Sequence, residues 1–403
     1  MSKRKNLIGV MAGLMIWLVF GLGNYFVALR LYRTVVTVIP GISETIFIAA
    51  SIILFLLMTL GFMRSILPIP VSTKGGLGWI SAYGSGIFVY LLLLFLAADF
   101  LLFLARLTLW LPDPMPQSIE FYSGAIVVLL TTGLVCYGLY HARQVSHTAY
   151  DIHLQDTRST NELNIVLISD IHLGAVNSEK RLPAIVQLIN QMNPDIVCIT
   201  GDLFDDSFSA VRNPDKASCL LRQIKAVYGV YASLGNHDAG KTLDDMVHFL
   251  EQSQIHLLND DYVMIDDRVV LVGRLDPSPI GGFGGLKRKG LKDLVGLVDT
   301  RLPIVVMDHT PAKLEQYGCE IDLVLSGHTH RGQMVPFNLI TRAVFATDYG
   351  YFRKDTASPH VVVTSGAGTW GPPMRIGSDN EIVSITLHWA YHSSRQTADQ
   401  YEK

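Results

Sequence analysis

Long apolar stretches fill the first 140 residues of the chain, whereas short apolar runs alternate with amphipathic stretches beyond residue 160. An α-helix needs about 20 apolar residues to cross the hydrocarbon core of a bilayer. Four stretches of the N-terminal half have about that length or more: Leu7–Leu29, Glu44–Met63, Ser81–Leu109 and Phe121–Tyr140. Prolines fall between these stretches, where they interrupt no helix. The pattern therefore predicts an N-terminal bundle of about four transmembrane helices.

Lys and Arg are unevenly placed around the four predicted spans. The residues on one side are Lys3, Arg4, Lys5, Arg64, Lys74 and Arg143, and those on the other side are Arg30, Arg33 and Arg106. The cytoplasmic side of a membrane protein carries the excess of Lys and Arg. With an even number of spans, this bias places both termini in the cytoplasm. We therefore expect a multi-pass integral membrane protein with a cytoplasmic C-terminal half.

Asp99 is the one acidic residue deep inside a predicted span. An ionisable residue within the membrane is a candidate functional site. Arg106 follows seven residues later on a similar helix face, and no second acidic residue completes a proton or ion path. An internal pair or hydrogen bond that fixes helix packing is therefore the favoured interpretation, and a role in transport is the alternative.

Beyond residue 160, apolar runs of strand length alternate with helix-like patterns. We expect strands at Asn164–Ser169, Asp195–Thr200, Val230–Leu234, Ile304–Met307, Leu323–Leu325, His360–Thr364 and Ile382–Leu387, and a hairpin of Tyr262–Ile265 with Val269–Val272. We expect helices at Glu179–Met192, Lys216–Val227, Thr242–Ser253 and Arg288–Val298. The alternation, with a late all-β section, indicates an α/β domain with mixed sheets. The expected organisation is a transmembrane domain (1–145), a linker (146–161), the α/β domain (162–390) and a polar C-terminal tail (391–403).

Polar side chains cluster where the predicted strands end. Five strands are each followed by such a cluster: Asp170 and His172; Asp202 and Asp205; Asn236, His237 and Asp238; His309; and His328 with His330. Loops at the carboxyl ends of strands are where α/β sheets place their sites. Each cluster alone is typical of an ordinary turn, but five in order predict one shared site.

The composition limits the choice of partner. Charged residues make up only 17% of the chain and hydrophobic residues 49%, which fits a membrane part joined to a globular part. The net charge is −3, and the only short basic run is Lys287–Lys289. We therefore expect no nucleic-acid partner, and a nuclease is disfavoured. The glycine-rich segment Ile280–Gly290 is interpreted as a surface loop rather than a nucleotide cradle.

The five clusters form the motifs Asp-x-His, Gly-Asp-x-x-Asp, Gly-Asn-His-Asp, a lone His and Gly-His-x-His. In these motifs the chain resembles the calcineurin-like metallophosphoesterase superfamily. Its bacterial membrane-associated branch shares the extension Gly327–Gln333 and a late segment like Ser365–Gly377. The resemblance covers about residues 160–390. It implies an α/β/β/α sandwich with two mixed sheets, in the membrane of a bacterial cell.

The resemblance also implies a dinuclear metal site. One ion would be held by Asp170, His172, Asp202 and His330, and the other by Asp202, Asn236, His309 and His328. Asp202 would bridge the two ions. Nitrogen and oxygen ligands without thiolates suit Mn²⁺, Fe or Zn²⁺. A hydroxide bridging the two ions would then attack phosphorus.

Three further residues have expected roles. By the resemblance, His237 stabilises the transition state or protonates the leaving oxygen, and Asp205 orients His237. The alternative for Asp205 is a helix N-cap. Arg375 is a candidate phosphate clamp, because its planar fork matches phosphate oxygens, or else a surface ion pair.

The function expected from these features is a membrane-anchored phosphoesterase. It would hydrolyse a phosphodiester, a phosphomonoester or a pyrophosphate bond. The membrane anchor makes the bilayer a partner and a lipid-linked compound a candidate substrate. The alternative is a membrane sensor or scaffold that binds a phosphorylated ligand without turnover.

Overall fold

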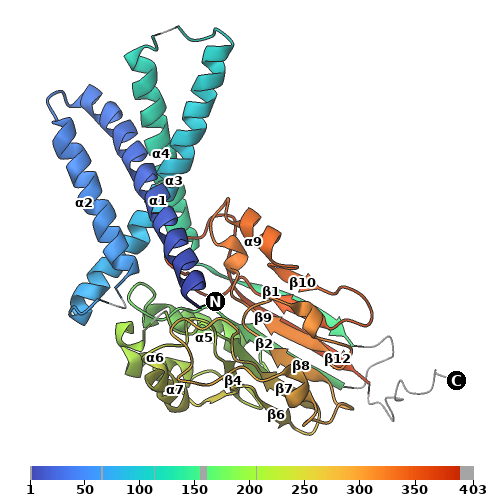
Figure 1. The fold of residues 1–403 in the computed structure, drawn as a ribbon. Coiled ribbons are helices and arrows are strands. Elements are labelled where there is room, and N and C mark those ends of the chain that lie inside the picture. The colour runs from blue at the N-terminus through green and yellow to red at the C-terminus, as the bar shows by residue number, and fades with distance from the viewer. Residues whose placement is uncertain (1, 65–66, 113, 155–160, 206, 391–403) are drawn as a thin grey trace. The chain divides into compact units, whose positions relative to one another are not determined.

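The computed structural model describes residues 2–64, 67–112, 114–154, 161–205 and 207–390, leaving aside the side chains of residues 2–14, 16 and 71. The predicted tail (391–403) and part of the predicted linker (155–160) lie outside the described residues. The chain divides into two compact units, Met1–Gly138 and Leu139–Lys403. Figure 1 labels the helices and strands of both units.

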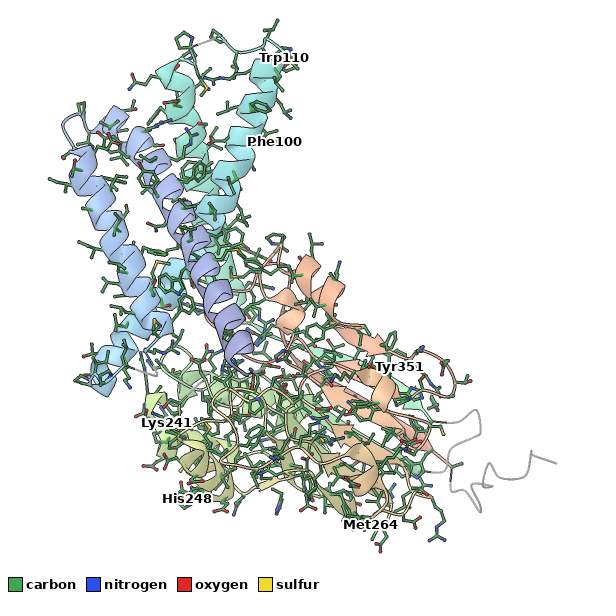
Figure 2. All side chains as sticks on the ribbon, viewed as in Figure 1. Phe100, Trp110, Lys241, His248, Met264 and Tyr351 are labelled. Atoms are coloured by element: carbon green, nitrogen blue, oxygen red, sulfur yellow. The ribbon has the colours of Figure 1, made fainter. Side chains whose placement is uncertain are left out.

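The first unit is built from helices α1 (Ser2–Val38), α2 (Glu44–Phe62), α3 (Val71–Leu107) and α4 (Gln117–His141). Among the described residues, three helical segments are long and apolar enough to cross a membrane: Glu44–Phe62, Ser72–Leu107 and Gln117–His141. The first predicted span lies in α1, where part of the side chains is outside the described set. Large apolar side chains such as Phe100 and Trp110 point outward from this unit (Figure 2).

Asp99 pairs across helices rather than with Arg106. Its Oδ1 lies 3.0 Å from Nη2 of Arg30 in α1, and the same nitrogen donates to Ser123 Oγ in α4 at 3.2 Å. The Arg30 side chain is only 7% exposed. Removing one partner of such a pair would leave a poorly solvated charge, which is energetically costly. The contacts of Arg30 with Asp99 and Ser123 therefore link α1 to α3 and α4. This geometry supports the packing interpretation of Asp99.

The second unit contains two six-stranded sheets. The first has the order β1-β12-β2-β3-β4-β5, with bounds Val145–His153, Asn380–Trp389, Asn161–Ile168, Ile196–Thr200, Val230–Ser233 and Ile255–Leu257. The second has the order β10-β11-β9-β8-β7-β6, with bounds Gly350–Phe352, His360–Val363, Leu323–Ser326, Ile304–Met307, Val269–Gly273 and Asp261–Ile265. Both sheets mix parallel and antiparallel pairs.

Helices cover the outer faces of the sheets. The α-helices of this unit are α5 (Leu182–Gln191), α6 (Pro214–Leu221), α7 (Leu243–Gln252), α8 (Leu291–Val295) and α9 (Asn338–Val344). Single 3₁₀ turns occur at Glu179–Arg181, Phe208–Ala210, Leu314–Gln316 and His330–Gly332. Helices α5, α6 and α7 pack on the first sheet (Figure 1). Helix α8 packs on the second.

The central strands are buried on both faces, which explains their unbroken apolar sequences. In β2, Ile165 and Leu167 belong to the core between the two sheets, whereas Val166 and Ile168 pack against the helices. The result is the predicted α/β/β/α sandwich with two mixed sheets, preceded by apolar helices.

Strand β1 occupies a segment for which the sequence predicts a linker. It pairs in parallel with β12 along its whole length, from Val145 opposite Asn380 to His153 opposite His388. As the edge strand it is half solvated, so its sequence contains no apolar run that would mark it. The chain therefore enters the first sheet directly after α4, which ends at His141.

Helix α8 is shorter than the predicted Arg288–Val298. Arg288 forms a two-pronged ion pair with Asp308, at 2.8 and 2.6 Å, and the Lys289 backbone N–H donates to Asp260 at 2.7 Å. These tertiary contacts hold the two residues outside the helix, which begins at Leu291 after Gly290. The glycine-rich loop before it is fixed to its neighbours, because Gly240 N donates to Gly282 O at 2.8 Å.

The core between the sheets should dominate the stability of the second unit. Leu325 is fully buried there, whereas Leu297 is 65% exposed. We expect Leu325→Ala to lower the free energy of unfolding by about 2–5 kcal/mol, because it leaves a cavity. The matched change Leu297→Ala should alter it by less than about 0.5 kcal/mol. Urea denaturation of the full chain in detergent measures both, and equal effects would contradict the assignment of the core.

Candidate metal centre

The five polar clusters meet at one end of the two sheets. Strands β2, β3 and β4 are parallel neighbours in the first sheet, and β8 and β9 are parallel neighbours in the second. The loops that follow them surround a cavity of about 520 Å³. Six predicted site residues line it: His172, Asp202, Asn236, His237, His328 and His330. Asp170 and His309 are fully buried behind this wall.

The first group of ligand atoms combines Asp170, His172 and His330. Nε2 of His172 lies 3.2 Å from Nε2 of His330, and Oδ1 of Asp170 lies 3.3 Å from the latter. Oδ2 of Asp202 is 3.7 Å from Nε2 of His172. Ligand atoms that bind one ion at about 2.1 Å are separated by about 3–4 Å. The group therefore has the spacing of a metal-binding site.

The protonation states in this group also suit a cation. Burial lowers the pKa of His172 to about 3. Burial alone would raise the pKa of Asp170, but His330 beside it holds that pKa well below its usual value. A neutral imidazole and an ionised carboxylate are the forms in which these side chains bind metals.

The second group combines Asp202, Asn236, His309 and His328. Nε2 of His309 lies 3.1 Å from Oδ2 of Asp202, and Nδ1 of His328 lies 2.9 Å from Oδ1 of Asn236. Ligand atoms of Asp202, His309 and His328 all lie within 4.8 Å of one another. Oδ2 of Asp202 thus reaches the ligand atoms of both groups.

The surroundings of His309 favour positive charge in the second group. Its Nδ1 donates to the carbonyl oxygen of Thr200 at 2.8 Å, and its buried Nε2 faces Asp202 Oδ2 at 3.1 Å without the geometry of a regular hydrogen bond. Burial would lower the pKa of His309, but Asp202 raises it well above its usual value. The position between Nε2 and the Asp202 carboxylate therefore favours a cation, and a metal ion fits this requirement.

The backbone is strained at the same residues. Five proposed ligands adopt left-handed φ angles between 50° and 70°: Asp170, His172, Asp202, His328 and His330. Residues other than glycine rarely occupy this region, and each costs about 1–3 kcal/mol. Strain of this kind persists where the surroundings impose it, as at functional sites.

Two glycines allow the loops to approach the carboxylates. A Cβ atom on Gly327 would overlap the Asp170 side chain, and one on Gly235 would overlap Asp202. Backbone donors then hold both carboxylates: His328 N lies 3.0 Å from Asp170 Oδ2, and His237 N lies 2.8 Å from Asp202 Oδ1. The glycines of these motifs are therefore required by close packing.

His237 and Asp205 lie beside the first group. The His237 ring lines the cavity, 5.0 Å from the His172 ring and 5.9 Å from the Trp370 ring between centroids. Asp205 Oδ1 is 4.0 Å from His172 Nδ1. One ligand atom each of His172, Asp205 and His237 lies within 4.8 Å of the others. Among the described helices Asp205 caps none, since Ser207 stands at the cap of the next 3₁₀ turn.

Arg375 occupies neither of its two predicted places. It is fully buried and does not line the cavity. Its Nη1 donates to the His330 carbonyl at 2.9 Å, its Nε to Asn380 Oδ1 at 2.9 Å, and its Nη2 to the carbonyls of Ser365 and Gly368 at 2.7 and 2.6 Å. These bonds leave the guanidinium no access to a phosphate. The predicted phosphate clamp and surface ion pair are both wrong, and we expect Arg375 to act as a positioning residue for His330.

Gln333 is a residue of the site that the sequence motifs do not identify as one. Its amide nitrogen donates to the carbonyls of Trp370 and Pro372 at 2.8 and 2.9 Å, and its amide oxygen accepts from Trp370 N at 2.8 Å. Gln333 therefore fixes the late loop (Ser365–Gly377), which carries Trp370, beside the ligand groups. The shared extension Gly327–Gln333 pointed to this residue, but the residues that Gln333 bonds lie nearly 40 positions later in the chain, so the sequence alone did not reveal its role.

Metal binding should depend on Arg375. We expect Arg375→Lys to weaken Mn²⁺ binding by about 10–100-fold, because losing a residue that orients a ligand typically has that effect. Lys cannot make the fork of bonds that holds His330 and the late loop. Isothermal titration of the full chain measures the affinity. The control Arg301→Lys, at a residue whose side chain is 73% exposed, should leave it unchanged. Undiminished affinity in Arg375→Lys would refute the positioning role.

Comparisons with known proteins agree with this geometry. The family model described as calcineurin-like phosphoesterase matches residues 163–332. A "Transmembrane protein with metallophosphoesterase domain" of Danio rerio is 33% identical over 287 residues, which cover 67% of this chain and 64% of that protein. This chain thus spans less than two thirds of the length of that relative.

A bacterial relative is covered almost completely. An uncharacterized metallophosphoesterase of Aquifex aeolicus (strain VF5) is 30% identical over 240 residues, which cover 59% of this chain and 90% of that protein. The crystal structure of TT1561 of Thermus thermophilus is 13% identical to this chain, with a TM-score of 0.34. The match covers 52% of this chain and 92% of that chain. This similarity is too low to bear on function. The chain therefore belongs to the calcineurin-like phosphoesterase family of metallophosphoesterases, with apolar N-terminal helices preceding the family domain.

Proposed function

We propose that this protein is a membrane-anchored phosphoesterase that hydrolyses a phosphodiester, a phosphomonoester or a pyrophosphate with two divalent metal ions. The observation that carries the proposal is the pair of buried ligand groups that share Asp202 at the base of a cavity. Bound ions supply an acidified water molecule and neutralise charge on phosphoryl oxygens. Family membership supports the reaction class.

The two ligand sets are part of the proposal. One set is Asp170, His172, Asp202 and His330, and the other is Asp202, Asn236, His309 and His328. The buried Nε2 of His309, which lies 3.1 Å from the Asp202 carboxylate without a regular hydrogen bond, supports a cation there. The nitrogen and oxygen donors favour Mn²⁺, Fe or Zn²⁺.

We assign the catalytic side-chain chemistry to His237. Its ring reaches the cavity from beside the first ligand group, where it can stabilise charge on the phosphoryl group or give a proton to the leaving oxygen. Asp205 lies near both His237 and His172, which supports its role in orienting the catalytic ring. The full set of ligands favours turnover over the alternative of a sensor that only binds.

The membrane setting completes the proposal. Relatives from Danio rerio and Bos taurus are named transmembrane proteins, and three apolar helices are present among the described residues. We propose a multi-pass protein of a bacterial cell membrane with its catalytic unit in the cytoplasm, as the placement of Lys and Arg favours. A substrate linked to lipid would then be within reach of the site.

The role of Asp202 can be tested with bis-p-nitrophenyl phosphate and Mn²⁺. We expect Asp202→Ala to lower kcat/KM of the full chain by at least about 100-fold, since loss of a shared ligand should cost no less than loss of an orienting residue. Asp245→Ala, at an exposed position on α7, should change it by less than about twofold. Activity that survives Asp202→Ala would refute the site. Tight phosphate binding without turnover by the wild type would support the sensor.

The cytoplasmic location predicts a labelling pattern. Cys219 and Cys319 are exposed in the catalytic unit, and Cys198 is buried. A membrane-impermeant maleimide should leave Cys219 and Cys319 unlabelled in intact spheroplasts and label both after lysis. The double variant Cys219→Ser with Cys319→Ser identifies the signal. Labelling of these cysteines in intact spheroplasts would place the unit on the outer side.

A further inference from the structure

Away from the ligand groups, the wall of the cavity is apolar. Its side chains come from the loop after β7, from the segment around α9 and from the late loop: Ile280, Met334, Phe337, Ile340, Phe345 and Trp370. No Lys, Arg or Glu occurs among the described residues that line the cavity. This part of the cavity therefore offers no cationic group for a second phosphate or a carboxylate.

The few polar side chains in this wall are already bonded within the protein. The hydroxyl of Thr341 donates to Asp348 Oδ2 at 2.6 Å, and that of Thr329 donates to the Asp348 carbonyl at 2.5 Å. The amide of Gln333 is engaged with the late loop. A sugar or a nucleobase would find few unpaired groups here, whereas a hydrocarbon chain needs none.

Helix α9 exposes apolar side chains that the fold does not use. It contains no buried residue, and Leu339 and Ile340 are 62% and 59% exposed. Phe337 before the helix and Trp370 in the late loop also line the cavity and are exposed, at 37% and 50%. Exposed apolar groups gathered at a polar site mark a surface that binds an apolar partner.

The position of α9 relative to the ligand groups is fixed. Gly332 packs so closely against Asn338 that a Cβ atom would overlap the backbone there. The contact from Thr341 to Asp348 ties the helix to the residue that also holds Thr329, between His328 and His330. The apolar wall is therefore built onto the same loop as two proposed ligands.

We infer that the site takes a phosphate compound with an apolar chain, whose phosphate lies at the ligand groups and whose chain lies along Phe337, Ile340, Phe345 and Trp370. This inference rests on the proposed function. A cavity of about 520 Å³ leaves room for more than a phosphate group, and its apolar wall is continuous with the ligand groups. Burial of the chain against the wall supplies the binding free energy.

The test compares two esters that release the same group, methyl p-nitrophenyl phosphate and hexyl p-nitrophenyl phosphate. Each buried methylene group can contribute up to about fourfold in kcat/KM. With the full chain in lipid nanodiscs and Mn²⁺, we expect the hexyl ester to be preferred by about tenfold or more. A preference near one would overturn the inference.

Two neighbouring residues of α9 provide the matched variants. Ile340 lines the cavity and Leu339 does not, although both are exposed to a similar extent. Ile340→Ser should reduce the preference for the hexyl ester by about fivefold, because a hydroxyl replaces the apolar contact. Leu339→Ser should preserve the preference of the wild type.

The outcomes separate the inference from the proposed function. A hexyl preference that is the same in both variants would arise from partition into the lipid, and would overturn the chain-binding wall. Failure to hydrolyse either ester, by an enzyme that still hydrolyses bis-p-nitrophenyl phosphate, would overturn the inference. Hydrolysis that survives Asp202→Ala would refute the proposed function itself.

Discussion

The second unit is organised around the buried carboxylate of Asp202. A carboxylate away from water requires compensating positive charge, and His309, whose pKa Asp202 raises, lies 3.1 Å from it. The loop geometry follows from this requirement. The left-handed residues turn their side chains toward one centre, and Gly235 allows the Asn236 loop to reach the carboxylate.

Most of the site could be predicted because its residues follow apolar strands directly. Asp170, Asp202 and His309 stand at the ends of strands whose unbroken apolar sequences are evident, and parallel strands end at the same edge. The sandwich follows from the same pattern. These features depend on local sequence and on general rules of sheet packing.

The rest depends on tertiary contacts that local patterns do not encode. A buried Arg375 and an exposed one have the same neighbours in sequence, and only the carbonyls that converge on it decide its role. Strand β1 is recruited by pairing with β12, more than 200 residues away. Arg30 meets Asp99 because two helices cross, so the intrahelical spacing to Arg106 was a poor guide.

Each proposed ligand set draws on both sheets. Asp202 comes from the first sheet, whereas His309 and His330 come from the second. Ions held there would fasten the two layers together at one end of the interface. A small slide of one layer over the other would displace ligands of both ions at once. The activity of this protein would then depend on the packing of its core. Substitutions between the sheets, far from any substrate, would weaken metal binding and so lower the activity before they unfolded the domain.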